Sequence, residues 1–116
     1  MGAWINEAIS ILEQHGYSAS KLNSADLRLI ILHESGGNPN AVNNWDSNAR
    51  AGNPSMGLCQ VVATTLRANT LDGYDDPLNP VDSIVGATEY ARHRYGSLSA
   101  VPGVQSVHSG GHYRGY

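Results

Sequence analysis

The chain has 116 residues, 41% of them hydrophobic and 15% charged, which suits one folded domain and excludes a disordered, highly charged chain. Its formal net charge is -3 and its seven Lys and Arg residues are scattered, so we expect no surface for nucleic acid or an anionic membrane. The single cysteine, Cys59, excludes an intramolecular disulfide, so packing alone must stabilise the fold.

Two helices are predicted in the first third of the chain. Apolar side chains recur at helical spacing in residues 3–14, and Gly16 follows as a stop signal. A second helix is predicted to start at Ser24 as its N-cap and to end at the glycine pair that begins with Gly36.

The middle of the chain alternates loops with short elements. Residues 38–55 are rich in Asn, Pro, Gly and Asp and predict a long ordered loop, a type of segment that is often functional. The short apolar segment at residues 57–62 can form part of a minor β-hairpin. A helix of about two turns is predicted at residues 63–68, before a second loop at residues 71–79.

The last third begins with a long predicted helix. Asn79 is its expected N-cap, with a proline at the first helical position and Asp82 three residues after the cap. Gly96 is expected to end it. The sequence beyond has little periodicity, so we predict a domain over residues 1–100 and a C-terminal arm or linker over residues 101–116.

Glu34 is the residue whose position indicates acid–base chemistry. It shares one helical face with Leu27, Ile30 and Ile31, so its carboxyl group is predicted to lie against apolar surface, which disfavours the ionised form. The negative end of the helix dipole raises its pKa in the same direction. A carboxyl group that stays protonated near neutral pH can act as a general acid. From periodicity alone, a solvated residue at a frayed helix end remains an equal alternative.

Residues 31–61, ILHESGGNPNAVNNWDSNARAGNPSMGLCQV, combine three motifs in order. They are a Glu-Ser-Gly-Gly helix end, an Asn-rich loop with Asn-Trp-Asp, and a Gly-Leu-x-Gln segment. With these motifs the chain resembles the soluble lytic transglycosylase domain, a relative of goose-type lysozyme, and especially the versions found inside phage tail tape-measure proteins. The resemblance spans about residues 25–96, with further similarity in the SLSAVPGV tail. It implies a small, mainly α, lysozyme-like fold of the α+β type, with a cleft beside the possible hairpin.

The resemblance implies roles for several residues. Glu34 would be the general acid and then the general base of a glycan-cleaving reaction. Ser35, Gly57, Leu58 and Gln60 would line the cleft, and Gln60 would contact the substrate or hold the catalytic carboxyl group. For Gly57 and Leu58, a plain buried strand is the alternative.

Aromatic residues are assigned less directly. Tyr90 falls where the family places a cleft-side aromatic residue. The Ala-Tyr-Asn motif that many of these enzymes carry near the C-terminus is absent, which leaves Tyr90, Tyr95 and Tyr113 as candidates for its tyrosine. Trp45 can stack on a sugar face or anchor its loop. Cys59 stands where the family commonly has Met, and we expect it to be a core residue.

The implied reaction cleaves the β-1,4 bond between N-acetylmuramic acid and N-acetylglucosamine in the glycan strand of bacterial peptidoglycan. In the lytic transglycosylases the substrate acetamido group assists, the acid becomes a base, and the C6 hydroxyl closes onto C1 to give a 1,6-anhydro end. One alternative is a lysozyme-type hydrolase in which Asp46 positions water, although Asp46 can instead cap its own loop. Another is a non-catalytic wall-binding module of a phage tail.

We expect no cofactor and no metal, because His33 and Glu34 lack a second histidine at zinc-binding spacing. No run approaches about 18 apolar residues and no signal peptide is recognisable, so we expect neither a membrane span nor secretion by a signal of its own. These features and the resemblance favour a monomeric domain of a larger, virion-associated phage tail protein that acts in the bacterial cell wall or periplasm.

Overall fold

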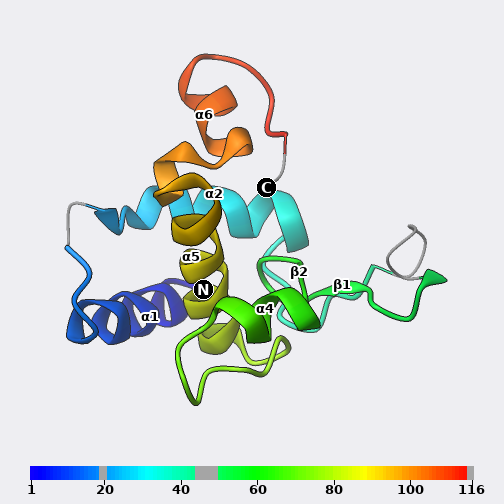
Figure 1. Ribbon diagram of the computed structural model, residues 1–116. Helices are drawn as coiled ribbons and strands as arrows, with labels where there is room; N and C mark the ends of the chain where they lie inside the picture. Colours follow the sequence, from blue (N-terminus) through cyan, green and yellow to red (C-terminus); the bar gives the residue numbers. More distant parts are fainter. Residues whose placement is uncertain (19–20, 44–49, 115–116) are drawn as a thin grey trace.

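The computed structural model describes residues 1–18, 21–43 and 50–114, and it confirms the predicted mainly helical fold with a minor hairpin (Figure 1). The helices are α1 (Gly2–Gln14), α2 (Ser24–Ser35), α4 (Ala63–Asn69), α5 (Pro80–Tyr95), the 3-10 helix η2 (Leu98–Ala100) and α6 (Pro102–His108). Two short strands, β1 (Ser55–Met56) and β2 (Val61–Val62), pair in antiparallel orientation, with Ser55 opposite Val62.

Helix α5 is the central element of the fold. Helices α1 and α4 and the η2 segment pack against it, and every residue from Ser83 to Glu89 is buried. Neighbours surround the middle of this helix, so its polar and small residues are buried together with its apolar ones. Helix α4 approaches so closely that a β-carbon at Gly86 would collide with Leu66.

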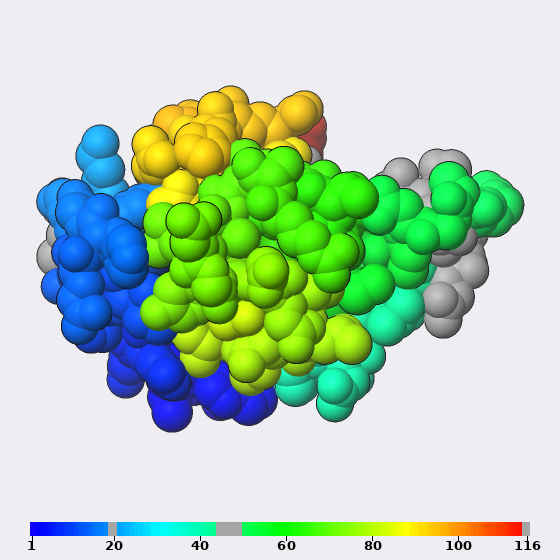
Figure 2. All heavy atoms as spheres, turned by 60° about the horizontal axis from the view of Figure 1, so that its bottom comes forward, coloured from blue at the N-terminus to red at the C-terminus, as the bar shows by residue number. Residues whose placement is uncertain are grey.

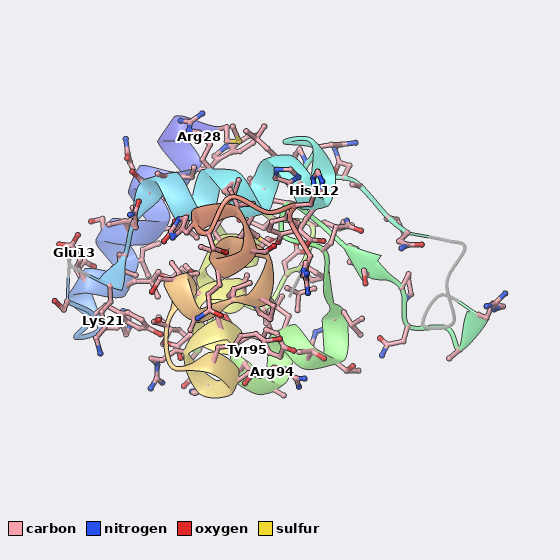
Figure 3. The ribbon with its side chains drawn as sticks, turned by 90° about the horizontal axis from the view of Figure 1, so that it is seen from above. Glu13, Lys21, Arg28, Arg94, Tyr95 and His112 are labelled. Atoms are coloured by element: carbon pink, nitrogen blue, oxygen red, sulfur yellow. The ribbon has the colours of Figure 1, made fainter. Side chains whose placement is uncertain are left out.

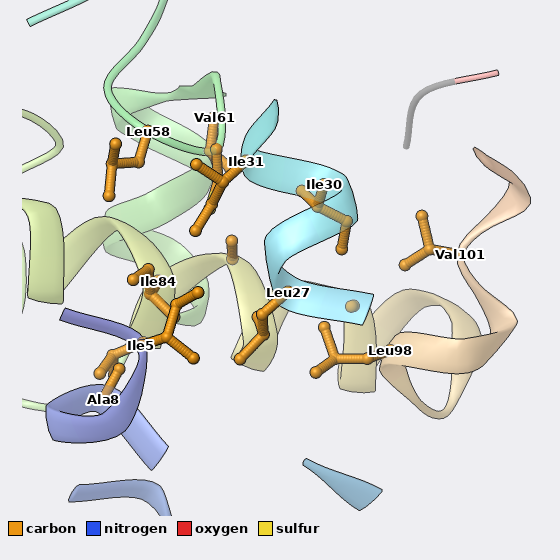
Figure 4. Close-up of a cluster of buried hydrophobic side chains, with 14 of the residues drawn as sticks. Ile5, Ala8, Leu27, Ile30, Ile31, Leu58, Val61, Ile84, Leu98 and Val101 are labelled. Atoms are coloured by element: carbon orange, nitrogen blue, oxygen red, sulfur yellow. The ribbon is translucent and has the colours of Figure 1, made fainter. Parts of the chain in front are cut away.

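One hydrophobic core joins the helices to the hairpin. Ile5 of α1, Ile31 of α2 and Ile84 of α5 are almost completely buried in it (Figure 4). Leu58 and Val61, from the turn and second strand of the hairpin, belong to the same cluster and lie near Ile31. Burial of one such side chain contributes about 1.5–3 kcal/mol, so this contact holds the hairpin beside the C-terminal half of α2.

Side-chain caps and glycines define the helix ends. The Asn79 side chain accepts hydrogen bonds from the N–H groups of residues 81 and 82, as predicted. The N-cap of α2 is Asn23 rather than the predicted Ser24, because the Asn23 side chain accepts from the N–H groups of residues 25 and 26 at 2.8 and 3.4 Å. Gly36 and Gly96 end α2 and α5 in the left-handed conformation, as predicted.

The hairpin is tied to the loop that follows α2. Val42 forms a bridge with Met56, and the N–H of Asn43 donates to the Ser55 carbonyl at 2.9 Å. The N–H of Gly57 donates to a carbonyl of the same loop at 2.8 Å. The segment leading into β1 extends away from the helical body (Figure 2). The loop and the hairpin therefore form one unit beside the end of α2.

Helix α6 packs the C-terminal segment onto α2. The weak periodicity of this segment predicted no helix, yet Val101 and Val104 are fully buried in the common core. After α6 the chain turns and runs toward the C-terminal end of α2 (Figure 1). Within the described ranges, no helix has both the length and the hydrophobicity that crossing a membrane requires.

Candidate active site

Glu34 lies in the last turn of α2 and is partly buried. It lies one turn beyond Ile30 and Ile31, which are fully buried, so its carboxyl group is at the edge of the core. Burial raises the pKa of Glu34 above its ordinary value. This effect is larger than the opposing effects of a hydrogen bond from Tyr113 and of the nearby charge of His33. The desolvated carboxyl group predicted from the helical pattern is therefore present.

Tyr113 is the direct partner of this carboxyl group. Its hydroxyl donates a hydrogen bond to Oε2 of Glu34 at 2.8 Å, and its ring stacks on His33 with 4.7 Å between the centroids and 12° between the planes. Of the three tyrosine candidates named from the sequence, Tyr113 is the one with a hydrogen bond to Glu34. Local sequence could not have selected it, because the two residues are 79 positions apart.

Three segments that are distant in the sequence meet around Glu34 and Tyr113. The pKa of Tyr113 is raised first by burial, then by the charge of Glu34, and also by Cys59 in the hairpin turn. The turn therefore lies within electrostatic range of the tyrosine. His112, the neighbour of Tyr113, lies over the C-terminal part of α2 (Figure 3). The end of α2 and the C-terminal tail therefore meet at the carboxyl group, and the hairpin turn lies near the tyrosine that binds it.

Gln60 braces the hairpin turn from within. Its Nε2 donates to the carbonyl oxygens of Ala41 and Gly57, each at 3.0 Å. Its backbone has a φ of 54°, a left-handed conformation that is uncommon for a residue other than glycine. The amide nitrogen is thus used to hold the loop after α2 against the turn, and among the described residues it forms no hydrogen bond to Glu34.

Gly57 and Leu58 are buried in the turn between the strands rather than in a strand. Gly57 has a φ of 82°, and a β-carbon there would collide with the Pro77 carbonyl oxygen, so packing requires glycine at this position. Leu58 has no exposed surface and lies beneath the turn in the core. Both residues therefore shape the turn from the inside.

Comparisons with known proteins identify the family of this chain. A family profile described as "Transglycosylase SLT domain" matches residues 12–108, which is most of the chain. The chain belongs to this family. A curated relative, the uncharacterized protein YqbO of Bacillus subtilis (strain 168), is 50% identical over 90 residues, which cover 78% of this chain and 6% of the relative. No solved structure matches the chain. The SLT domain is thus placed among the lytic transglycosylases, a family that acts on peptidoglycan.

The remaining predicted site residues of the SLT domain have different surroundings. The Ser35 hydroxyl donates to the Ile31 carbonyl at 3.1 Å and accepts from the N–H of residue 37 at 3.2 Å, so it caps the end of α2. Tyr90 of α5 is partly buried and packs edge-to-face on Tyr95, with 6.4 Å between the ring centroids. Trp45 and Asp46 lie outside the described residues.

The SLT domain also has a pocket of about 670 Å³ between the segment that follows α1 and the C-terminal half of α5. Its lining includes Tyr17, Lys21, Glu89 and Arg92, and does not include Glu34. The buried Glu89 carboxylate accepts a hydrogen bond from Arg92 at 3.1 Å, and Arg92 also donates to the Tyr17 hydroxyl at 2.9 Å. These bonds connect α5 to the segment after α1, which gives this second buried carboxylate a structural explanation.

Proposed function

We propose that this SLT domain cleaves the β-1,4 bond between N-acetylmuramic acid and N-acetylglucosamine in peptidoglycan, with Glu34 as general acid and then general base. The observation that carries the proposal is the partly buried carboxyl group at the end of α2, whose pKa is raised by burial. Membership of the SLT family supports the substrate and the type of reaction. A general acid needs a pKa close to the working pH, and burial moves Glu34 in that direction.

In the proposed reaction Glu34 first gives its proton to the glycosidic oxygen, and the bond from that oxygen to C1 of the muramic acid breaks. The substrate acetamido group stabilises C1 while the leaving sugar departs. The Glu34 carboxylate then takes the proton of the C6 hydroxyl, and O6 bonds to C1. The product is a 1,6-anhydro end, no water is consumed, and Glu34 has recovered its proton.

Tyr113 suits the second half of this cycle. Its hydroxyl donates to Glu34, and this hydrogen bond lowers the pKa of the carboxyl group against the larger effect of burial. A residue that must give and then take a proton works best when neither form is strongly preferred. We therefore assign Tyr113 the role of stabilising the carboxylate formed after the first proton transfer.

The described residues favour a reaction with one protein carboxylate. Retaining glycosidases place two carboxyl groups about 5 Å apart, and such a pair perturbs the titration of both. The causes of the raised pKa of Glu34 include burial, Tyr113 and His33, but no carboxylate of the described ranges. Asp46, the candidate second carboxylate, lies outside the described residues, and we propose that the substrate supplies the nucleophile, as a transglycosylase requires.

We propose that substrate contacts come from the rim around Glu34. Ser35 and Gln60 are partly buried and so retain exposed atoms, whereas Gly57 and Leu58 would act by holding the turn in place. Trp45, Asp46 and Tyr90 complete the proposed substrate-binding set.

The masses of the reaction products test this proposal. The purified domain is incubated with isolated peptidoglycan, and the soluble fragments are separated and weighed. We expect fragments that are one water lighter than those with reducing ends. Reducing ends would contradict the transglycosylase reaction and indicate a hydrolase in which Asp46 positions water. The absence of any fragment, with the domain still sedimenting with the wall, would indicate a non-catalytic wall-binding module.

We also propose that the domain is a monomeric part of a larger phage tail protein that delivers it to the cell wall or periplasm. The resemblance to tape-measure domains supports this, and the chain spans about 6% of the length of the curated relative. Mass spectrometry of purified virions should find peptides of this domain within a much longer chain. A stand-alone secreted product would contradict the proposal.

A further inference from the structure

A buried carboxylate at the beginning of α2 is paired with the end of α6. Asp26, in the first turn of α2, is 3% exposed. Its Oδ1 lies 2.9 Å from Nε2 of His108, the last residue of α6, whose side chain is 52% exposed. The pair therefore joins the C-terminal segment to α2 at the end opposite Glu34.

A tight turn leads from this pair to Tyr113. Gly110 has a φ of 87°, and the N–H of Gly111 donates to the Ser106 carbonyl at 2.7 Å. A β-carbon at Gly111 would lie 2.8 Å from the Ser106 hydroxyl oxygen, so the close return of the chain depends on glycine. We call residues 109–113 the strap. Its course is fixed at the start by the turn and at its far end by Tyr113.

Both ends of the strap are attached to one helix. Asp26 and Glu34 are eight positions apart in α2, which corresponds to about 12 Å along the helix axis. The five Cα-to-Cα steps from His108 to Tyr113 can span at most about 17 Å. Fully extended, the strap exceeds this distance by only about 5 Å, so where it begins restricts where the Tyr113 hydroxyl can lie.

We propose that Asp26 and His108 are positioning residues for the reaction: the contact between their side chains sets the start of the strap so that Tyr113 reaches Glu34. The inference rests on the proposed function of Glu34 for its catalytic consequence, although the geometry itself does not. The pair acts on the carboxyl group through Tyr113, since neither residue contacts Glu34 in the described structure. Without the pair, the tyrosine ring leaves His33 and the carboxyl group loses its hydrogen bond donor.

A measurement that does not depend on catalysis tests the geometry. The stacked Tyr113 ring shifts the NMR signals of the His33 ring protons, because an aromatic ring lies 4.7 Å away. His108→Ala should abolish this shift. His112→Ala is the matched control, because His112 is an exposed histidine of the same strap with no ion pair among the described residues, and it should retain the shift. Asp26→Asn keeps the size of the side chain and should reduce the shift even if His108→Ala does not fold.

A double-mutant cycle tests the consequence for the reaction. His108→Ala should lower kcat/KM by about tenfold, the effect of losing one hydrogen bond to a charged group. In a Tyr113→Ala background the same change should have no further effect, because the pair acts through the tyrosine. A lower melting temperature with an unchanged His33 shift would overturn the inference and leave the pair a purely structural role. If the parent domain cleaves no peptidoglycan, the proposed function fails, while the His33 shift still decides the positioning role.

Discussion

Replacing Tyr113 with phenylalanine isolates one hydrogen bond of the proposed site. The change removes the hydroxyl that donates to Glu34 at 2.8 Å and keeps the ring that stacks on His33. Hydrogen bonds to charged groups contribute about 1.5–3 kcal/mol, and the partial exposure of this pair favours the lower end of that range. A loss of about 1.4 kcal/mol is a factor of ten, so we expect kcat to fall roughly tenfold.

The pH dependence gives the sign of the effect. The Tyr113 hydrogen bond stabilises the ionised carboxyl group and lowers the pKa of Glu34. Without this hydrogen bond the pKa of Glu34 rises, so Glu34 stays protonated to higher pH. The basic limb of the pH–rate profile therefore moves to higher pH. The assay is the initial rate of soluble fragment release over a pH series, with Tyr95→Phe as the control, because the Tyr95 hydroxyl accepts from Arg94 instead. A basic limb that stays in place or moves to lower pH would refute the reasoning.

Three stability predictions follow from the same structure. Because burial raises the pKa of Glu34, the folded state binds the proton more tightly than the unfolded state, and stability is lost as the pH rises through the raised pKa. Glu34→Gln should therefore raise the melting temperature at neutral pH, and this gain should vanish below the ordinary carboxyl pKa; a gain that persists in acid would contradict this. Gly57→Ala should cost about 2 kcal/mol or more in urea unfolding because of the collision with backbone, whereas Gly73→Ala, at a φ of 88° with open space around it, should cost less; equal losses would remove the packing argument. Asn23→Ala should cost about 1 kcal/mol and Ser24→Ala close to nothing, and the reverse order would restore Ser24 as the N-cap of α2.

Local features of the fold were predictable from the sequence. The Asn79 cap and the glycine stops at Gly36 and Gly96 depend on interactions within a few residues, so the sequence pattern predicts them directly. The cap of α2 was displaced by one residue because Asn23 and Ser24 are both good N-caps, and only the backbone conformation distinguishes them.

Features that depend on distant contacts were not predictable. Helix α6 has only seven residues, and its buried Val104 gains its partners from α2 and the core rather than from periodicity. The burial of residues 83–89 on every side of α5 reflects the neighbours of that helix. The hydrogen bond between Tyr113 and Glu34 closes 79 positions of chain, so the local sequence could only name the tyrosine among others. The burial of Glu34 followed from its helical face, but the type of reaction came from the family resemblance.

The most direct test of the central claim compares two glutamates of the same domain. Glu34→Gln removes the proposed acid, and Glu13→Gln makes the same change at an exposed position of α1. Cleavage of purified peptidoglycan at neutral pH should fall by at least about a hundredfold in Glu34→Gln, as expected for loss of a general acid, and should be unchanged in Glu13→Gln. Both variants should still sediment with cell walls. Equal cleavage rates for Glu34→Gln and the parent domain would contradict the assignment of Glu34 as the catalytic acid.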